Sequence, residues 1–213
     1  AEPAADPNLV LRVAVAAAEF GLPIAPGTLR NLKKCPIGDR NWTDESRELF
    51  IRLLASGPAL LNVWEDIDFI DVPGKLIPEW LGVRNRPSAS AAHRYTIDRH
   101  MVEVVTRLGR ETPSGGRYDD RHYEALLLAG ILHDIGKRPG VANHAAEGAR
   151  HATVVVERMG FDRDIVRWVT LLVREHLTLS EFATGRNPND PNVGDDLAGR
   201  LDLNTTGLLL ITN

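Results

Sequence analysis

The chain has a single cysteine, no long apolar run and fewer basic than acidic residues. Each of these shortages argues against a class of protein. Because Cys35 stands alone, no intrachain disulfide can form, and a reducing, cytoplasmic compartment fits best. No stretch approaches about 18 consecutive apolar residues, and residues 1–7 lack the basic start and apolar run of a signal peptide, so we expect neither a membrane helix nor a secretory leader. The formal net charge of −4 argues against a nucleic-acid partner, because duplex-binding domains usually carry a basic face.

What is present is the ordinary balance of a globular protein. The 213 residues are 43% hydrophobic and 25% charged, which disfavours disorder, collagen and coiled coil. Of the 25 basic residues 21 are arginine, a composition that suits a pocket for phosphate or carboxylate groups. The chain begins without methionine and stops at an apolar run, residues 208–211, so we expect it to be part of a longer protein.

Hydrophobic residues recur with helical periodicity nearly everywhere, so the sequence predicts an all-α fold. Asn8 and Thr43 are the predicted N-caps of the first and third helices. Three prolines and two glycines predict an irregular segment at 72–87, near the boundary between a helical linker region, residues 1–75, and a second helical region, residues 76–213. The predicted helices cover residues 8–20, 28–34, 43–55, 58–69, 97–108, 121–136, 144–159, 162–177, 192–200 and 205–213.

The dipeptide His133-Asp134 follows a segment that is apolar on every side, residues 125–132, and therefore predicts a buried helix. Two ionisable side chains at the end of a buried helix need partners, because burying them unpaired is costly. A metal ion is one such partner, and Lys137, four residues after His133, is another. Ala129 and Gly130, one turn before His133, are expected to leave room for the ion.

Three more histidines are expected to point inward from other helices. His100 shares a face with apolar residues, His144 opens a helix with Gly148 one turn later to clear space, and His176 continues an apolar stripe. Imidazole and carboxylate together suit a divalent metal such as Mn, Fe, Zn or Co better than Ca. The alternative for each histidine is a core side chain hydrogen-bonded to backbone, and for Asp134 a cap or a pair with Lys137 alone. Three remaining histidines are expected to lie at the surface or outside the ligand set: His93, His122 and His151.

Residues 128–137, with the sequence LAGILHDIGK, resemble the central motif of the HD superfamily of metal-dependent phosphohydrolases. The resemblance implies an HD-domain helical bundle over residues 76–213, with His100, His133 and Asp134 as metal ligands. It also implies that His144 and His176 match the additional histidines of members with a second metal. Metal identity stays open among Mn, Fe, Zn, Co and Mg.

A more detailed resemblance is to the HD region of bifunctional uridylyltransferase/uridylyl-removing enzymes of the actinobacterial type. Asn143-His144-Ala145 and Asn187 depart from that family's pattern, and its final aspartate ligand would follow Asn213. A longer parent would then also carry a nucleotidyltransferase domain and glutamine-sensing domains. The segments that carry the resemblance are residues 7–13, 76–80, 83–87, 93–100, 174–177 and 183–186.

The resemblance implies an enzyme that hydrolyses the phosphodiester joining UMP, or AMP, to a tyrosine of the nitrogen-signalling protein PII. Asp134, Lys137 and His144 would act in catalysis, while Arg174 and Arg186 would contact the substrate. Two alternatives remain at this point. One is a hydrolase of free nucleotides or of a guanosine alarmone on the same fold, and the other is a catalytically silent helical module whose histidines are structural.

Overall fold

The computed structural model describes residues 6–35, 37, 42–88, 95–109, 120–178, 181 and 185. Its helical content confirms the predicted all-α class: the described residues form nine α-helices and one 3₁₀ helix, and no strand. None of these helices is both long and apolar enough to cross a bilayer. The elements are α1 (Leu9–Phe20), α2 (Pro26–Leu32), α3 (Asp44–Leu54), α4 (Ala59–Phe69), α5 (Val72–Leu76), the 3₁₀ helix η2 (Pro78–Gly82), α6 (Ile97–Leu108), α7 (Asp120–Leu132), α8 (His144–Arg158) and α9 (Arg163–Glu175).

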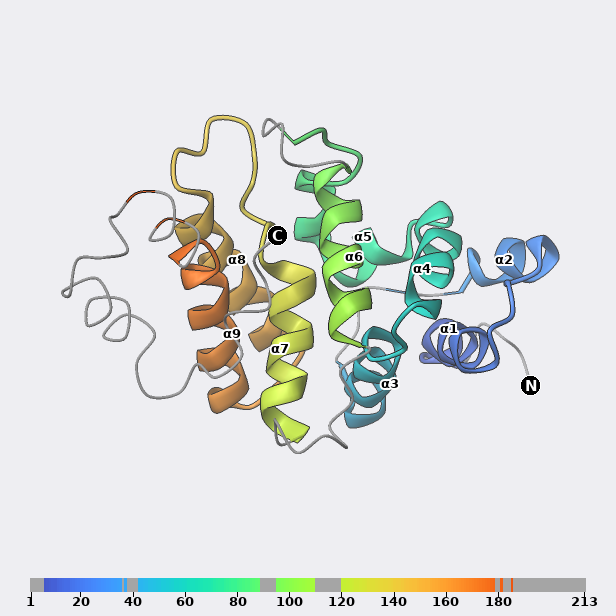
Figure 1. The fold of residues 1–213 in the computed structure, drawn as a ribbon. Coiled ribbons are helices and arrows are strands. Elements are labelled where there is room, and N and C mark those ends of the chain that lie inside the picture. The colour runs from blue at the N-terminus through green and yellow to red at the C-terminus, as the bar shows by residue number, and fades with distance from the viewer. Residues whose placement is uncertain are drawn as a thin grey trace.

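Helices α6 to α9 form a bundle, and α7 lies at its centre (Figure 1). α7 packs against both α6 and α9, and α8 packs along α9. Because α7 has neighbours around it, every residue of the segment 125–132 is buried, as its apolar sequence predicts, whereas Asp120 and Arg121 at the start of the helix are exposed. α9 instead buries only one stripe, which includes Val169 and Val173, and exposes the opposite face.

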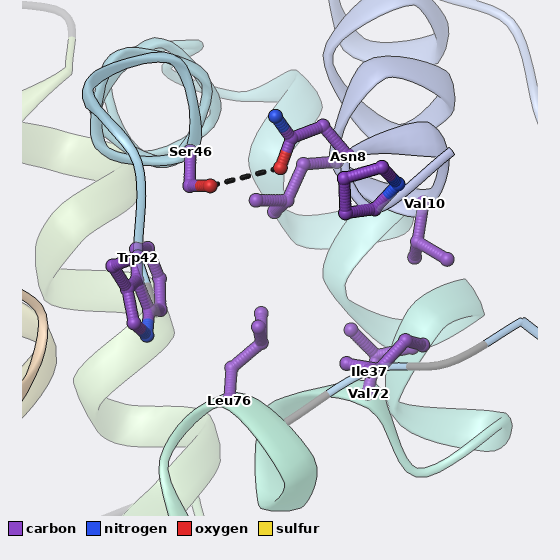
Figure 2. A pocket seen from close by; sticks show the side chains of 9 residues that line it. Asn8, Val10, Ile37, Trp42, Ser46, Val72 and Leu76 are labelled. Carbon is purple, nitrogen blue, oxygen red and sulfur yellow. Dashed lines mark hydrogen bonds between the residues drawn. The ribbon is translucent and has the colours of Figure 1, made fainter. Parts of the chain in front are cut away.

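The first three long helices make a second packing unit, in which α1 lies against α3 and α4. Its core continues into the bundle, since α3 contacts α7 and α4 contacts α6. Figure 2 shows the pocket between α1, α3 and α5, where Ser46 Oγ donates a hydrogen bond to Asn8 Oδ1 at 2.8 Å. The division of the chain at residue 75 stays a prediction.

Several predicted helix ends or caps differ from the structure, and each difference has a physical cause, although α1 and α3 do begin after Asn8 and Thr43 as predicted. Asn8 does not cap α1 through its side chain, because Ser46 takes its oxygen, whereas Thr43 caps α3 in a reciprocal capping box with Ser46. α2 begins two residues early, with Pro26 at its first position, where a missing N–H costs nothing.

The segment 72–87, predicted to be irregular, contains α5 and η2, which begin with prolines in their first turns. The predicted helix 121–136 is too long, since α7 ends at Leu132 and residues 133–136 form a turn. The helices predicted at 192–200 and 205–213 lie outside the described residues.

Candidate metal centre

Four segments of the bundle bring five predicted ligands together around Asp134. His100 comes from α6, His133 and Asp134 from the turn after α7, His144 from the first residue of α8, and His176 from the end of α9. The Nε2 atoms of His144 and His176 lie 3.7 and 3.6 Å from Asp134 Oδ1, and His133 Nε2 lies 3.7 Å from Asp134 Oδ2. Asp134 therefore lies at the centre of the cluster, within 4 Å of three histidine nitrogens.

A contact between two glycines fixes the turn that carries His133 and Asp134. A β-carbon on Gly136 would lie 2.3 Å from the backbone nitrogen of Gly148 and 2.3 Å from the carbonyl oxygen of His144. One on Gly148 would lie 3.3 Å from the carbonyl oxygen of His133. The first turns of α8 therefore rest directly on the backbone of the turn, and this contact explains why the two ligand-bearing segments meet.

This packing corrects two expectations about empty space. The room beside Gly130 is filled by α6, because a β-carbon there would lie 2.9 Å from Leu108 Cδ1. The room beside Gly148 is filled by the turn and by Val173. These small residues serve close helix packing, and they do not hold space for an ion.

Backbone hydrogen bonds orient two of the imidazoles. His133 Nδ1 lies 2.8 Å from the Gly130 carbonyl oxygen, and His176 Nδ1 lies 2.7 Å from the Val173 carbonyl oxygen. Because a carbonyl only accepts, Nδ1 carries the proton in both rings, and a neutral ring then offers the lone pair of Nε2 toward Asp134. Histidine ligands of metals are commonly oriented by such a bond to backbone.

The ligand atoms fall into two groups that share one carboxylate. The first group consists of His100, His133 and Asp134, whose ligand atoms all lie within 4.8 Å of one another. The second group consists of Asp134, His144 and His176, whose ligand atoms meet the same limit. The Nε2 atoms of His144 and His176 are buried and have no hydrogen-bond partner. Unpartnered buried nitrogens beside a carboxylate fit one or two divalent cations with a shared ligand.

The charges of the cluster also fit a metal. Burial lowers the pKa of His133 to about 4 and also lowers the pKa of His144. Burial alone would raise the pKa of Asp134, but the neighbouring His133 and His176 and the charge of Lys137 hold it well below its usual range. Near neutral pH His133 and His144 are therefore neutral and Asp134 is ionised, which are the states in which these groups bind metal.

Lys137 lies beside the cluster, with its Nζ 3.2 Å from Asp134 Oδ2, so Asp134 has an ammonium partner as well as histidine neighbours.

The sequence analysis did not single out Arg138, which ties the ligand-bearing turn to the rest of the protein. Arg138 donates a hydrogen bond from Nη2 to the Glu79 carbonyl oxygen at 2.8 Å and so ties the turn to η2. The Glu79 carboxylate in turn receives two hydrogen bonds from Arg158, at 2.8 and 2.7 Å.

The remaining candidates lie elsewhere. Arg174 is exposed in the last turn of α9. Arg186 and His93 lie outside the described residues. His122 stacks on Trp168 with ring centroids 4.1 Å apart, and His151 Nε2 lies 3.0 Å from Glu147 Oε1, so both contact groups outside the ligand set.

Curated relatives share this sequence over most of its length. The chain is 40% identical over 194 residues to the bifunctional uridylyltransferase/uridylyl-removing enzyme of Streptomyces coelicolor. The matched region covers 90% of this chain and 22% of that enzyme. The enzyme of the same name from Mycobacterium tuberculosis is 38% identical over 90% of this chain and 23% of its own length. That from Corynebacterium glutamicum is 33% identical over 96% of this chain and 29% of its own length.

The chain is therefore homologous to part of these enzymes and spans less than a third of their length. No family model matches it.

Proposed function

We propose that this chain is a metal-dependent phosphohydrolase region of the HD type, which removes a nucleotidyl group from a tyrosine of the PII protein. One observation carries the proposal: Asp134 is shared by two groups of histidines, one of which has two buried, unpartnered nitrogens. The relatives' name includes a uridylyl-removing activity, which is the hydrolysis of such a phosphodiester. The leaving nucleotide is UMP or AMP.

His100, His133 and Asp134 would hold one divalent metal, and Asp134, His144 and His176 could hold a second one. Such an ion lowers the pKa of a bound water and polarises a phosphoryl oxygen. Mn, Fe, Zn, Co and Mg all remain candidates, since sites of imidazole and carboxylate accept several ions.

The protein's own side chains supply position, charge and protons. Asp134 is 2% exposed and Lys137 22% exposed, so the ammonium stands on the solvent side of the carboxylate, where it would neutralise charge developing on the phosphate. His144 is 24% exposed and would transfer a proton to or from the substrate where it does not hold a second ion. Tyrosinate is a tolerable leaving group, since its phenol has a pKa of about 10.

Recognition of the substrate is assigned to arginine. Arg174 and Arg186 would contact the nucleotide or the PII surface, because a guanidinium matches phosphate geometry.

Glutamine-sensing and nucleotidyltransferase domains would belong to a longer parent chain.

The test combines metal content with turnover in the 213-residue chain. We expect about one or two transition metals per chain after reconstitution, and release of UMP or AMP from nucleotidylated PII. His133→Ala and Asp134→Ala should lose the metal and lower turnover by more than about a hundredfold, since both change ligands. His122→Gln, on the preceding helix α7 and stacked on Trp168, is the matched control and should keep both the metal and the turnover.

Three results would contradict the proposal. Metal retained in the double variant His133→Ala/Asp134→Ala would refute the site. Faster hydrolysis of free nucleotides than of nucleotidylated PII would favour the free-nucleotide hydrolase. Absence of metal after reconstitution with Mn, Fe and Zn would favour the silent helical module.

A further inference from the structure

Arg138 follows the ligand-bearing turn and has no part in the chemistry proposed above, yet its guanidinium makes two specific contacts. Nε donates a hydrogen bond to the Ile135 carbonyl oxygen at 3.3 Å, and Nη2 donates one to the Glu79 carbonyl oxygen at 2.8 Å. The first bond lies within the turn, and the second crosses to η2, 59 residues earlier in the chain. The side chain therefore joins the turn to a distant segment.

η2 leaves open the space that this guanidinium occupies. A β-carbon on Gly82, the last residue of η2, would lie 2.5 Å from Arg138 Nε and 2.6 Å from Arg138 Cζ. Because atoms that are not bonded do not approach so closely, any other residue at position 82 would displace the guanidinium. The absence of a side chain at Gly82 is therefore what lets Arg138 reach the carbonyl oxygen of Glu79.

η2 and the residues after it are in turn held to two helices of the metal centre. The Glu79 carboxylate accepts two hydrogen bonds from Arg158 on α8, at 2.8 and 2.7 Å. The backbone N–H of Asn85 donates to Asp98 Oδ2 on α6 at 2.8 Å. Each of these helices carries one histidine of the centre. Arg138 thus connects the turn to a segment that is itself fixed against α6 and α8.

We propose that Arg138 is a positioning residue of the metal centre, an inference that rests on the proposed metal-binding function. Arg138 holds the turn so that His133 and Asp134 lie beside the histidines of α6 and α8 before a metal binds. The contact of Gly136 with α8 fixes the turn against one neighbour, and Arg138 fixes it against a second. Removing a group that orients metal ligands commonly weakens metal binding by about 10- to 100-fold, although the group does not touch the ion.

The sign of the effect separates positioning from charge. A cation near a metal site repels the ion, so loss of an arginine charge should by itself tighten metal binding or leave it unchanged. Weaker binding therefore reports lost positioning. Arg150 is the matched control, since it lies on α8 near the centre and its guanidinium pairs with Glu147 of the same helix.

Titration of the 213-residue chain with Co²⁺, followed by visible absorption, measures the affinity. Arg138→Ala should raise the Kd at least about tenfold and change the spectrum of bound Co²⁺, which depends on ligand geometry. Arg150→Ala should lower the Kd or keep it within about twofold of the wild type, with an unchanged spectrum.

Gly82→Ala disturbs the same contact from the side of η2. The three atoms nearest to its added β-carbon all belong to the guanidinium of Arg138, a flexible group that can move away, so the variant should fold. We expect the Kd to rise at least about threefold in the wild-type background and less than about twofold in the Arg138→Ala background, because both changes remove one contact. This variant also tests the proposal if Arg138→Ala fails to fold.

Amide hydrogen exchange in the presence of chelator gives a measurement without metal. The backbone N–H groups of Ile135 and Lys137 donate to carbonyl oxygens three residues earlier, at 3.0 and 2.9 Å. Both amides should exchange at least about tenfold faster in Arg138→Ala, because the turn opens more often, and at the wild-type rate in Arg150→Ala.

The outcomes separate this inference from the proposed function. Wild-type protein that binds no Co²⁺ would contradict the proposed function, and the exchange rates would then decide whether Arg138 fixes the turn. Unchanged Kd and exchange in Arg138→Ala would overturn the inference and leave the proposed function intact. An unchanged or lower Kd together with faster exchange would also overturn it, since Arg138 would then stabilise the turn without any effect on the metal.

Discussion

The helices α1 to α4 and the bundle α6 to α9 treat polar side chains in opposite ways. In the first region ion pairs such as Arg12–Glu45 and Arg52–Glu19 lie at the surface with each partner about half exposed. In the bundle His133, Asp134 and His176 are at most 3% exposed and lie beside one another. The first region keeps these ion pairs at the surface and buries the neutral pair Ser46 and Asn8, whereas the bundle buries a cluster of ionisable side chains.

This difference shows which region contains buried polar groups that lower the free energy of unfolding. Burying polar groups costs free energy unless they are fully paired, and two nitrogens of the centre are unpaired in the absence of an ion. The bundle must hold its centre by backbone contacts and apolar packing, of which the Gly136–Gly148 contact is the tightest at the site. Substitutions and pH changes should therefore affect the two regions unequally.

The largest effect is expected from filling that contact. Gly136→Ala places a β-carbon 2.3 Å from two backbone atoms of α8, which cannot move as a flexible side chain can. We expect a loss of about 3 kcal/mol or more in the free energy of unfolding, because overpacking against backbone displaces a whole helix. Urea denaturation of the metal-free protein measures it, and metal binding should weaken in parallel.

Gly27→Ala in α2 is the matched control from the first region. Its added β-carbon would meet nothing nearer than Arg30 Nη2 at 3.7 Å, so stability should be unchanged or rise by up to about 1 kcal/mol. Similar losses in the two variants would mean that the close approach of α8 is not what holds the centre.

The next effect is a pH dependence confined to the bundle. The pKa of His133 falls from 6.5 to about 4 on folding, so between these values the unfolded chain binds more protons than the folded one. Stability should therefore decrease as the pH falls through this window, by about 3 kcal/mol for this residue at 1.36 kcal/mol per pKa unit. The lowered pKa of His144 acts in the same direction. Chemical denaturation with chelator, at steps from pH 7 to 4, measures the slope.

His133→Gln isolates this residue, because carboxylates titrate near the acidic end of the same window. The variant should show a shallower slope between pH 6.5 and 4, whatever its absolute stability. Parallel curves for variant and wild type would show that the pKa of His133 is not depressed in the folded protein.

The all-α class and the five predicted ligands followed from periodicity and from ionisable residues at apolar positions. Such patterns are strong where a side chain is surrounded by apolar neighbours, as His133 and His176 are. That these ligands lie together in space is seen in the structure; that they bind metal stays a prediction. The relatives support the stated resemblance over nine-tenths of the chain.

The end of α7 could not be predicted, because its cause is non-local. Residues 133–136 have no strong helix breaker before Gly136, and the turn forms where α8 docks on that glycine. The side chain of Asn8 failed as a cap for the same reason, since a residue 38 positions away donates to its oxygen. Close contacts between distant segments leave little local trace in sequence.

A smaller effect is expected from the buried hydrogen bond of the first region. Ser46→Ala leaves Asn8 Oδ1 without the donor that Figure 2 shows and removes the acceptor for the backbone N–H of Thr43. The cost should be about 1–2 kcal/mol in urea denaturation. Ser56→Ala is the control, since Ser56 Oγ bonds only locally to the Leu53 carbonyl oxygen, and its cost should stay below about 0.5 kcal/mol. Equal costs would place the effect in helix propensity instead of the buried bond.

The smallest effect is expected at the exposed ion pairs. Arg52→Gln removes a hydrogen bond of 2.6 Å to Glu19, yet both partners are about half exposed, so solvent already screens their attraction. We expect the Tm to change by less than about 2 °C, and by less still at 1 M salt, where the Debye length is about 3 Å. A loss as large as that of Ser46→Ala, independent of salt, would mean that the first region also depends on specific charge pairing, and the contrast between the two regions would fail.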